Sequence, residues 1–362
     1  MKNAILYALF ILLVAGCTQQ MQAYSVQGVY QSAKTDYNLD VLVTDELKLR
    51  TNTLFSGEMT RLTLNVLNLA DVPFVNVRAI VINADDLHPT TDNPVFDLIE
   101  PNNSETFQWD LTAPRLGIGE TLYLNNIKVR TYYETYAEAS KVILLKKPGD
   151  RTYESTYSFS SASPIVLSFS TSYETVTTIN NNIKNFTINM IYFNNYSGII
   201  DYYDNSNITD NYVRWIVLGA DKKLTFYNIQ DSNTPWHDIS SMYNIWKSDF
   251  GQALADENIA KLGLAASDLE LKNYYLLKYE TIAGSGIGGC GVTGLTPELS
   301  NMYSEQRRVL WMTRGTTKIN VLRFGAPTVE DLTEVQVDAR MSYGYSQDFG
   351  GQDFGAVIYG LG

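Results

Sequence analysis

The sequence predicts an all-β fold made of two antiparallel β-sandwiches, the second enlarged by a mixed α/β insertion. Three observations carry this prediction. Short segments alternate apolar and polar residues with a period of two, turn clusters separate them, and 25 of the 362 residues are tyrosine, a residue that favours strands. With 45% hydrophobic and 18% charged residues, the composition excludes a disordered chain.

The N-terminus has the features of an export signal. Lys2 precedes an apolar run from Ala4 to Ala15, and small and polar residues follow it. Such a run is too short to span a hydrocarbon core of about 30 Å. We therefore expect residues 1–16 to be a signal peptide.

The four residues Val14-Ala15-Gly16-Cys17 resemble a lipobox, the motif before the lipid-modified cysteine of prokaryotic lipoproteins. The resemblance implies cleavage before Cys17, a lipid on its sulfur, and an extracytoplasmic protein anchored to the membrane through that lipid. The alternatives are an ordinary signal peptide with an incidental cysteine and an uncleaved anchor. Residues 17–40 are polar and predict a flexible tether. With Cys17 lipidated, Cys290 has no partner in the chain, and its state stays open.

The first sandwich is expected over residues 41–150. About seven short strands fit there, separated by turn clusters such as Pro101-Asn102-Asn103-Ser104. The alternating segments are 41–43, 47–49, 62–67, 75–81, 106–111, 121–124, 127–133 and 141–145.

The second sandwich is expected over residues 151–362, because three landmarks recur in order. Residues 186–191 mirror 62–67, Ala326-Pro327 mirrors Ala113-Pro114, and 337–343 mirror 127–133. This half is too long for one sandwich, so we expect an insertion at about 205–315. It contains the helical segments Asp238–Phe250 and Ala253–Leu262.

The first half also resembles the Ig-like modules of exported prokaryotic proteins, the CARDB-like and related types. The resemblance rests on Leu62–Asn68, on Val75-Asn76-Val77, and on Glu100-Pro101 through Trp109 to Ala113-Pro114, and it covers about residues 47–145. It implies Ig-like sandwiches with an adhesive, scaffolding or spacer role and no catalytic residues.

Charge and motifs exclude several kinds of site. A net charge of −12 argues against a nucleic-acid partner. The Gly284–Gly289 run fits G-x-G-x-x-G but lacks the following helix of a dinucleotide site, so it predicts a loop. We expect no catalytic, cofactor-binding or metal residues. Whether Asp201, Asp204 and Asp210 hold Ca²⁺ is left open, since the EF-hand spacing is absent.

The expected function is non-enzymatic binding or scaffolding at the cell envelope, with a protein or glycan partner. One alternative is a carbohydrate-binding or carbohydrate-active lipoprotein whose site lies in the insertion, where Trp236, Tyr243 and Trp246 could stack on sugars; core packing is the competing role for these rings. A subunit of a surface assembly or a spacer is the third possibility. Four N-x-S/T sequons are candidate glycosylation sites where the host modifies exported proteins: Asn102, Asn185, Asn195 and Asn207.

Overall fold

The computed structural model describes residues 42–89, 94–150, 156–172, 174–179, 182–194, 196–200, 213–228, 236–278, 315, 317–351 and 354–360. All of them belong to one compact unit, residues 40–362. The described chain is mostly β-strand, arranged in several sheets with predominantly antiparallel pairing, as the sequence predicts.

One four-stranded sheet has the order β1-β3-β7-β5. Alternate residues of its central strands point inward, and Leu62, Leu64, Phe107 and Trp109 are fully buried. This is the period of two expected for 62–67 and 106–111. The strands are β1 (Leu42–Leu49), β3 (Met59–Asn68), β5 (His88–Pro89) and β7 (Ser104–Thr112).

A second four-stranded sheet has the order β11-β13-β19-β16. Its central strand buries Ile188, Met190 and Tyr192 on one face. The strands are β11 (Ile165–Thr171), β13 (Lys184–Asn194), β16 (Thr225–Phe226) and β19 (Thr317–Ala326).

The largest sheet has ten strands, seven of them in the order β17-β18-β15-β20-β9-β4-β6. These are β4 (Phe74–Ile82), β6 (Val95–Ile99), β9 (Lys128–Lys146), β15 (Val213–Asp221), β17 (Trp236–Asp238), β18 (Lys272–Lys278) and β20 (Thr333–Gly350). Three shorter strands attach to β9 or β20: β10 (Ser158–Ser160), β12 (Thr175–Thr177) and β14 (Ile199–Ile200). A further small sheet joins β2 (Thr53–Phe55), β21 (Ala356–Tyr359) and β8 (Thr121–Leu124).

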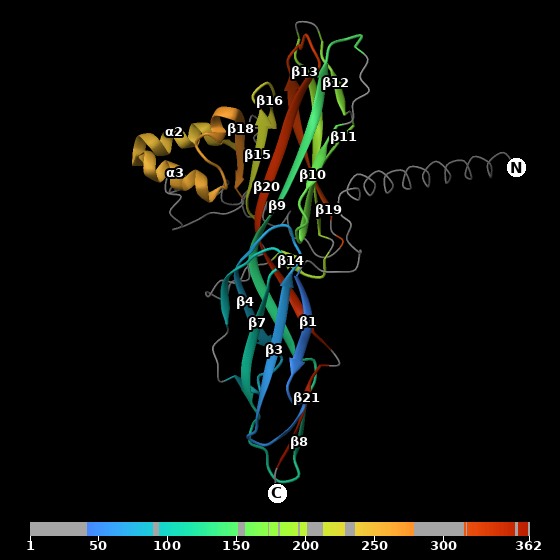
Figure 1. The fold of residues 1–362 in the computed structure, drawn as a ribbon, viewed down its shortest axis with the longest axis vertical. Coiled ribbons are helices and arrows are strands. Elements are labelled where there is room, and N and C mark those ends of the chain that lie inside the picture. The colour runs from blue at the N-terminus through green and yellow to red at the C-terminus, as the bar shows by residue number, and fades with distance from the viewer. Residues whose placement is uncertain are drawn as a thin grey trace, which may run out of the picture. The chain divides into compact units, whose positions relative to one another are not determined.

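The strands β9 and β20 form the longest pairing of the described chain. They run antiparallel in unbroken register from Lys128 opposite Gly350 to Leu145 opposite Thr333 (Figure 1). The sequence predicts two strands, 127–133 and 141–145, where β9 is continuous. The residues between them keep the strand period, but the buried positions hold the small residues Ala137 and Ala139, which are a weak apolar signal.

Each four-stranded sheet faces a different part of the ten-stranded sheet. Phe107 of β7 meets Phe96 of β6 edge to face, with 4.8 Å between ring centroids. Phe226 of β16 lies 4.7 Å from Tyr275 of β18. These contacts place aromatic rings between strands of different sheets.

The pairing continues across the expected boundary at residue 150. The β9–β20 ladder joins the two halves of the chain, and the last strand, β21, pairs with β8 and β2 of the first half. The boundaries 41–150 and 151–362 therefore separate stretches of sequence that share one sheet.

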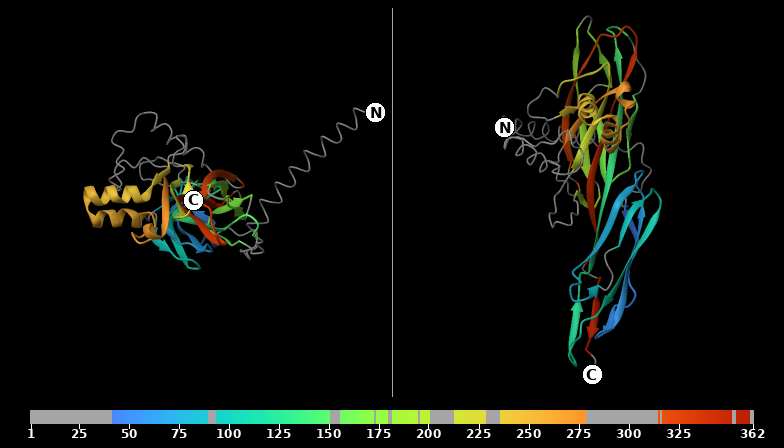
Figure 2. Two further views of the ribbon diagram at one scale, coloured as in Figure 1. Left: turned by 90° about the horizontal axis from the view of Figure 1, so that it is seen from above. Right: turned by 90° about the vertical axis from the view of Figure 1, so that its left-hand side faces the viewer.

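The helical segments lie where the sequence predicts them, as α2 (Ile239–Phe250) and α3 (Gln252–Lys261), and a short α4 (Asp268–Leu271) follows. The side chain of Asp238 caps α2 by accepting the Ser240 backbone N–H at 2.9 Å. The two longer helices lie side by side and project to one side of the sheets (Figure 2). The rest of the expected insertion is not simply a surface loop, because β15 and β18 within it are strands of the ten-stranded sheet.

Candidate functional site

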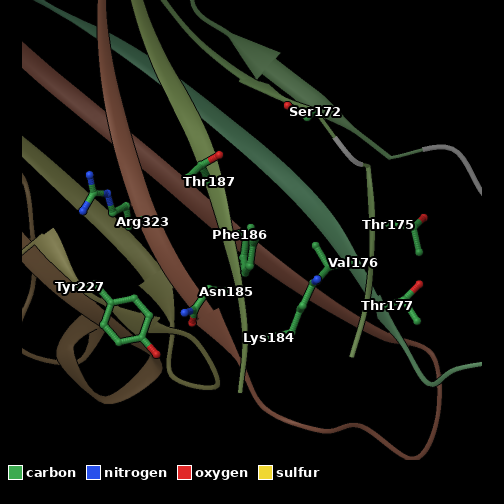
Figure 3. Close-up of a pocket in the computed structure, with 10 residues that line it drawn as sticks. All are labelled: Ser172, Thr175, Val176, Thr177, Lys184, Asn185, Phe186, Thr187, Tyr227 and Arg323. Carbon is green, nitrogen blue, oxygen red and sulfur yellow. The ribbon is translucent and has the colours of Figure 1, made fainter. Parts of the chain in front are cut away.

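A groove opens where β13 extends beyond its neighbour. β11 pairs with only the last seven residues of β13, Ile188–Asn194, and no strand of the described chain pairs with Lys184–Thr187 on that side. A cavity of about 720 Å³ lies there. Ten residues line this groove (Figure 3): Ser172, Thr175, Val176, Thr177, Lys184, Asn185, Phe186, Thr187, Tyr227 and Arg323.

The lining residues come from both faces of the sheet. Phe186 and Lys184 share the face of buried Ile188, whereas Asn185 and Thr187 point the other way. Arg323 lies opposite Thr187 in the register and therefore shares its face. Figure 3 shows β13 passing between Arg323 and Tyr227 on one side and the residues of β12 on the other. The cavity therefore runs along the edge of β13, with lining residues on both faces of the sheet.

The groove is positively charged. Among the described residues that line it, Lys184 and Arg323 are the two charged ones, and both are exposed. In the part of the chain that the structure describes, neither side chain has an ion-pair partner. The chain as a whole carries a net charge of −12, so the positive charge of this site is opposite in sign to that of the whole chain. An anionic group would meet two cations without a counter-charge.

The apolar part of the groove is anchored in the core. The Phe186 ring stacks on Phe324 with 5.8 Å between centroids, and Phe324 lies 5.1 Å from Phe226. Gly325 allows Tyr227 to lie across the sheet, because a Cβ at Gly325 would come within 2.5 Å of the Tyr227 Oη. These contacts hold the two aromatic rings of the groove in place.

A second cavity, of about 310 Å³, is lined by the residues that follow α3, by the start of α4, and by strands of the ten-stranded sheet. Of its four charged lining residues, Glu138, Asp338 and Arg340 take part in ion pairs, and the Asp268 carboxyl accepts the Ala265 backbone N–H at 2.7 Å. Lys272 pairs with Asp338, Arg340 Nε lies 3.6 Å from Glu138 Oε1, and the Arg340 guanidinium lies 3.7 Å from the centroid of the Tyr136 ring. Three carboxylates and one guanidinium line this cavity, and two of those carboxylates, of Glu138 and Asp338, already lie beside cations. The groove is the stronger candidate, because its two cations have no ion-pair partner among the described residues.

The three aromatic residues considered as a possible sugar site, Trp236, Tyr243 and Trp246, have structural contacts. Trp236 and Trp246 are only 3% and 1% exposed. Trp236 meets Phe226 edge to face, and Trp246 packs in a cluster that joins α2 and α3 to β15 and β18. The role of these two tryptophans is therefore core packing, since buried rings leave no face for a sugar.

Tyr243 links the two helices. Its hydroxyl donates to Asp256 Oδ1 at 2.8 Å, and Gln252 Nε2 donates to both the Tyr243 hydroxyl and, at 2.7 Å, Asp256 Oδ1. These hydrogen bonds, from Gln252 first and Tyr243 second, lower the pKa of the Asp256 carboxyl. Tyr243 thus has a structural task in the helix pair.

Of the four sequons, Asn102 is exposed in a turn at φ 62°, and Asn185 lies in the groove. Asn195 and Asn207 fall outside the described residues, as do Cys17, Cys290, the Gly284–Gly289 run and the carboxylates proposed for Ca²⁺. Among the described residues, no three His, Cys, Asp or Glu side chains form a metal-binding group. The helices within the described ranges are all too short or too polar to cross a membrane.

The sequence analysis missed the groove. Lys184 and Arg323 stand 139 positions apart, and no motif connects them. The signal that could have suggested the site is the mismatch between the long alternating segment of β13 and its shorter predecessor, β11.

Comparisons with known proteins do not assign the chain to a family. No family model matches, and no curated protein matches. Among solved structures, α2-macroglobulin of Escherichia coli is 13% identical at a TM-score of 0.21, over 64% of this chain and 12% of that one. A Salmonella α2-macroglobulin mutant is 12% identical at a TM-score of 0.21, over 64% of this chain and 13% of that one. The pilus backbone protein of Streptococcus pneumoniae is 9% identical at a TM-score of 0.12, over 79% and 88%. The chain thus spans about an eighth of the macroglobulin chains.

Proposed function

We propose that this chain is an exported, lipid-anchored protein of the cell envelope or surface, with a non-enzymatic binding or scaffolding role. The observation that carries the binding role is the groove beside β13, where Lys184 and Arg323 are exposed and have no ion-pair partner among the described residues. Anchoring rests on the lipobox-like residues before Cys17. The lipid would hold the protein at the extracytoplasmic face of the membrane by burying acyl chains, at about 0.8 kcal/mol per CH₂.

We further propose that the chain contains two Ig-like sandwiches, the second carrying the helical insertion. Support comes from matching strand orders, because β3 lies between β1 and β7 just as β13 lies between β11 and β19. In this proposal β9 and β20 belong to both sandwiches and replace a linker. A carbohydrate-binding alternative centred on Trp236 and Trp246 has no observation in its favour, since both rings are buried.

The anchoring proposal is tested by intact mass and detergent partitioning of the protein from its native host, beside the variant Cys17→Ala. We expect a mature mass that begins at Cys17 and includes acyl chains, and release of the variant from the membrane. An unmodified, freely soluble wild-type product would refute lipid anchoring.

The binding role is tested with envelopes from a host lacking the gene, to which the soluble Cys17→Ala chain is added back. We expect saturable binding that a second substitution, Arg323→Glu, weakens. Lys222→Glu is the matched control, because Lys222 is exposed in the turn before β16 and does not line the groove. Binding that does not saturate, or that both reversals weaken equally, would refute a specific role of the groove.

A further inference from the structure

We infer that the groove receives an extended acidic segment of a partner polypeptide, which adds as a strand to the open edge of β13. The inference rests on the proposed binding function and names the chemistry of the ligand. It follows from the backbone groups at the edge, from the placement of the two cations, and from the length of the opening.

The backbone of Asn185 faces the open side. The Arg323 N–H donates to the Asn228 side chain at 2.7 Å, and the Arg323 C=O accepts from the Tyr227 N–H at 3.0 Å. Both groups of Arg323 therefore point away from β13, so Thr187, its register partner, directs its own groups to the β11 side. The Thr187 C=O accordingly accepts from the Thr171 hydroxyl at 3.4 Å.

Alternate residues of a strand direct their backbone groups to the same side. The N–H and C=O of Asn185 therefore also face the β11 side, but β11 ends at Thr171, opposite Ile188. Within the described ranges no residue bonds to these two groups of Asn185. An exposed strand edge of this kind is the template that an added strand uses, with main-chain hydrogen bonds giving affinity.

The side chains beside this edge select for acidic residues. A segment in the line of β11 would direct alternate side chains to the two faces of the sheet. On one face they would approach Lys184 and Phe186, and on the other Thr187 and Arg323. Each face thus offers one cation that has no ion-pair partner within the described ranges. Phe186 and Val176 offer an apolar contact.

The length of the opening limits the segment. Four residues of β13, Lys184–Thr187, lie beyond β11, which corresponds to about 13 Å of extended chain at about 3.3 Å per residue. A core of four to five partner residues would fill such an edge.

The test uses a labelled eight-residue peptide in which glutamate and valine alternate, with the full chain in detergent and binding measured by fluorescence anisotropy. The chain is produced in a host without N-glycosylation, since Asn185 belongs to a sequon. We expect Lys184→Glu and Arg323→Glu each to weaken binding by about tenfold or more. Lys222→Glu should leave it unchanged, and a lysine–valine peptide should not compete.

A pair of substitutions at Asn185 separates backbone from side-chain recognition. Asn185→Pro removes the N–H that faces the open side, at an edge position where proline is tolerated in a sheet. Asn185→Ala keeps the N–H and removes only the amide. We expect Pro to abolish binding and Ala to preserve it, with thermal melts showing that both variants fold. Equal loss in both variants would refute strand addition, and the Arg323→Glu result decides the charge argument if the proline variant does not fold.

Treatment of the envelopes used above distinguishes this inference from the function on which it rests. Loss of binding after protease digestion supports a polypeptide partner. Persistence after protease with loss after periodate oxidation would mean a saccharide ligand and would overturn the inference while the binding role stands. Absence of saturable binding to untreated envelopes would overturn both.

Discussion

Asn68 and Asn194 hold the same position at the ends of two different strands and make the same turn. Each side-chain oxygen accepts the backbone N–H two residues later, from Ala70 at 2.9 Å and from Tyr196 at 3.1 Å. Each side-chain NH₂ donates to the carbonyl four residues later, of Val72 at 3.0 Å and of Gly198 at 2.9 Å. Both side chains are fully buried. The turns after β3 and β13 are therefore stabilised by the same pattern of asparagine hydrogen bonds.

Replacing either asparagine by alanine should destabilise the protein by about 3 kcal/mol. The loss leaves a buried N–H and at least one buried carbonyl without partners, and each such group costs about 1–3 kcal/mol. Asn68 donates to a second carbonyl, of Ile99, and Asn194 accepts from the Tyr345 hydroxyl. Urea unfolding measures the change. Asn103→Ala, at an exposed turn position, is the control, and equal effects of all three variants would contradict the argument.

Gly355→Ala should destabilise by about 2–3 kcal/mol, because a Cβ there would lie 1.9 Å from the Leu124 carbonyl oxygen. Since the obstacle is backbone, β21 would have to move away from β8. The control is Gly117→Ala, whose Cβ would meet only the movable Glu120 carboxyl at 3.2 Å. Thermal unfolding compares the two, and a smaller effect at Gly355 than at Gly117 would refute the close approach.

Asn258→Leu should stabilise the protein by about 1–2 kcal/mol. This side chain of α3 is fully buried, and neither its nitrogen nor its oxygen has a hydrogen-bond partner in the described part of the chain. Removing an unpaired buried amide relieves its desolvation cost. Asn244→Leu, at an exposed position of α2, serves as the control and should stay within about 0.5 kcal/mol of wild type. A melting temperature lowered by Asn258→Leu would show that the amide is needed.

Tyr243→Phe should raise the pKa of Asp256. The hydrogen bonds from Gln252 and Tyr243 depress this pKa in the folded state. A depressed pKa stabilises the fold above the unfolded carboxyl value of about 3.9, and this contribution is lost as the pH falls through the folded value. The free energy of unfolding of the variant should therefore fall less steeply than that of the wild type as the pH decreases. Carboxyl NMR titration checks the pKa, with Gln252→Ala expected to shift it further.

The sequence predicted the elements that have a clear period. The strands around Leu64 and Phe107 follow their alternation, and α2 and α3 begin and end within one residue of the expected segments. Asp238 and Gly251, at the ends of α2, are the residue types that start and stop helices. Local signals of this kind do not depend on the rest of the fold.

Features that depend on pairing between distant segments were not predictable. Many residues next to Trp236 and Trp246 in the sequence are polar. Only the packing of α2 and α3 on β15 and β18 buries Trp246. The groove depends on where β11 stops relative to β13, which is a property of register. One sequence does not contain that information.

The ladder between β9 and β20 has a mechanical consequence. A chain of modules joined by flexible linkers bends at each junction and yields one module at a time under tension. Here the two halves are joined by the 18 residue pairs of β9 and β20. A load along these strands is therefore resisted by many hydrogen bonds in shear. Neither half can be pulled out without tearing a strand from the other, and we expect a single rupture event for the whole unit.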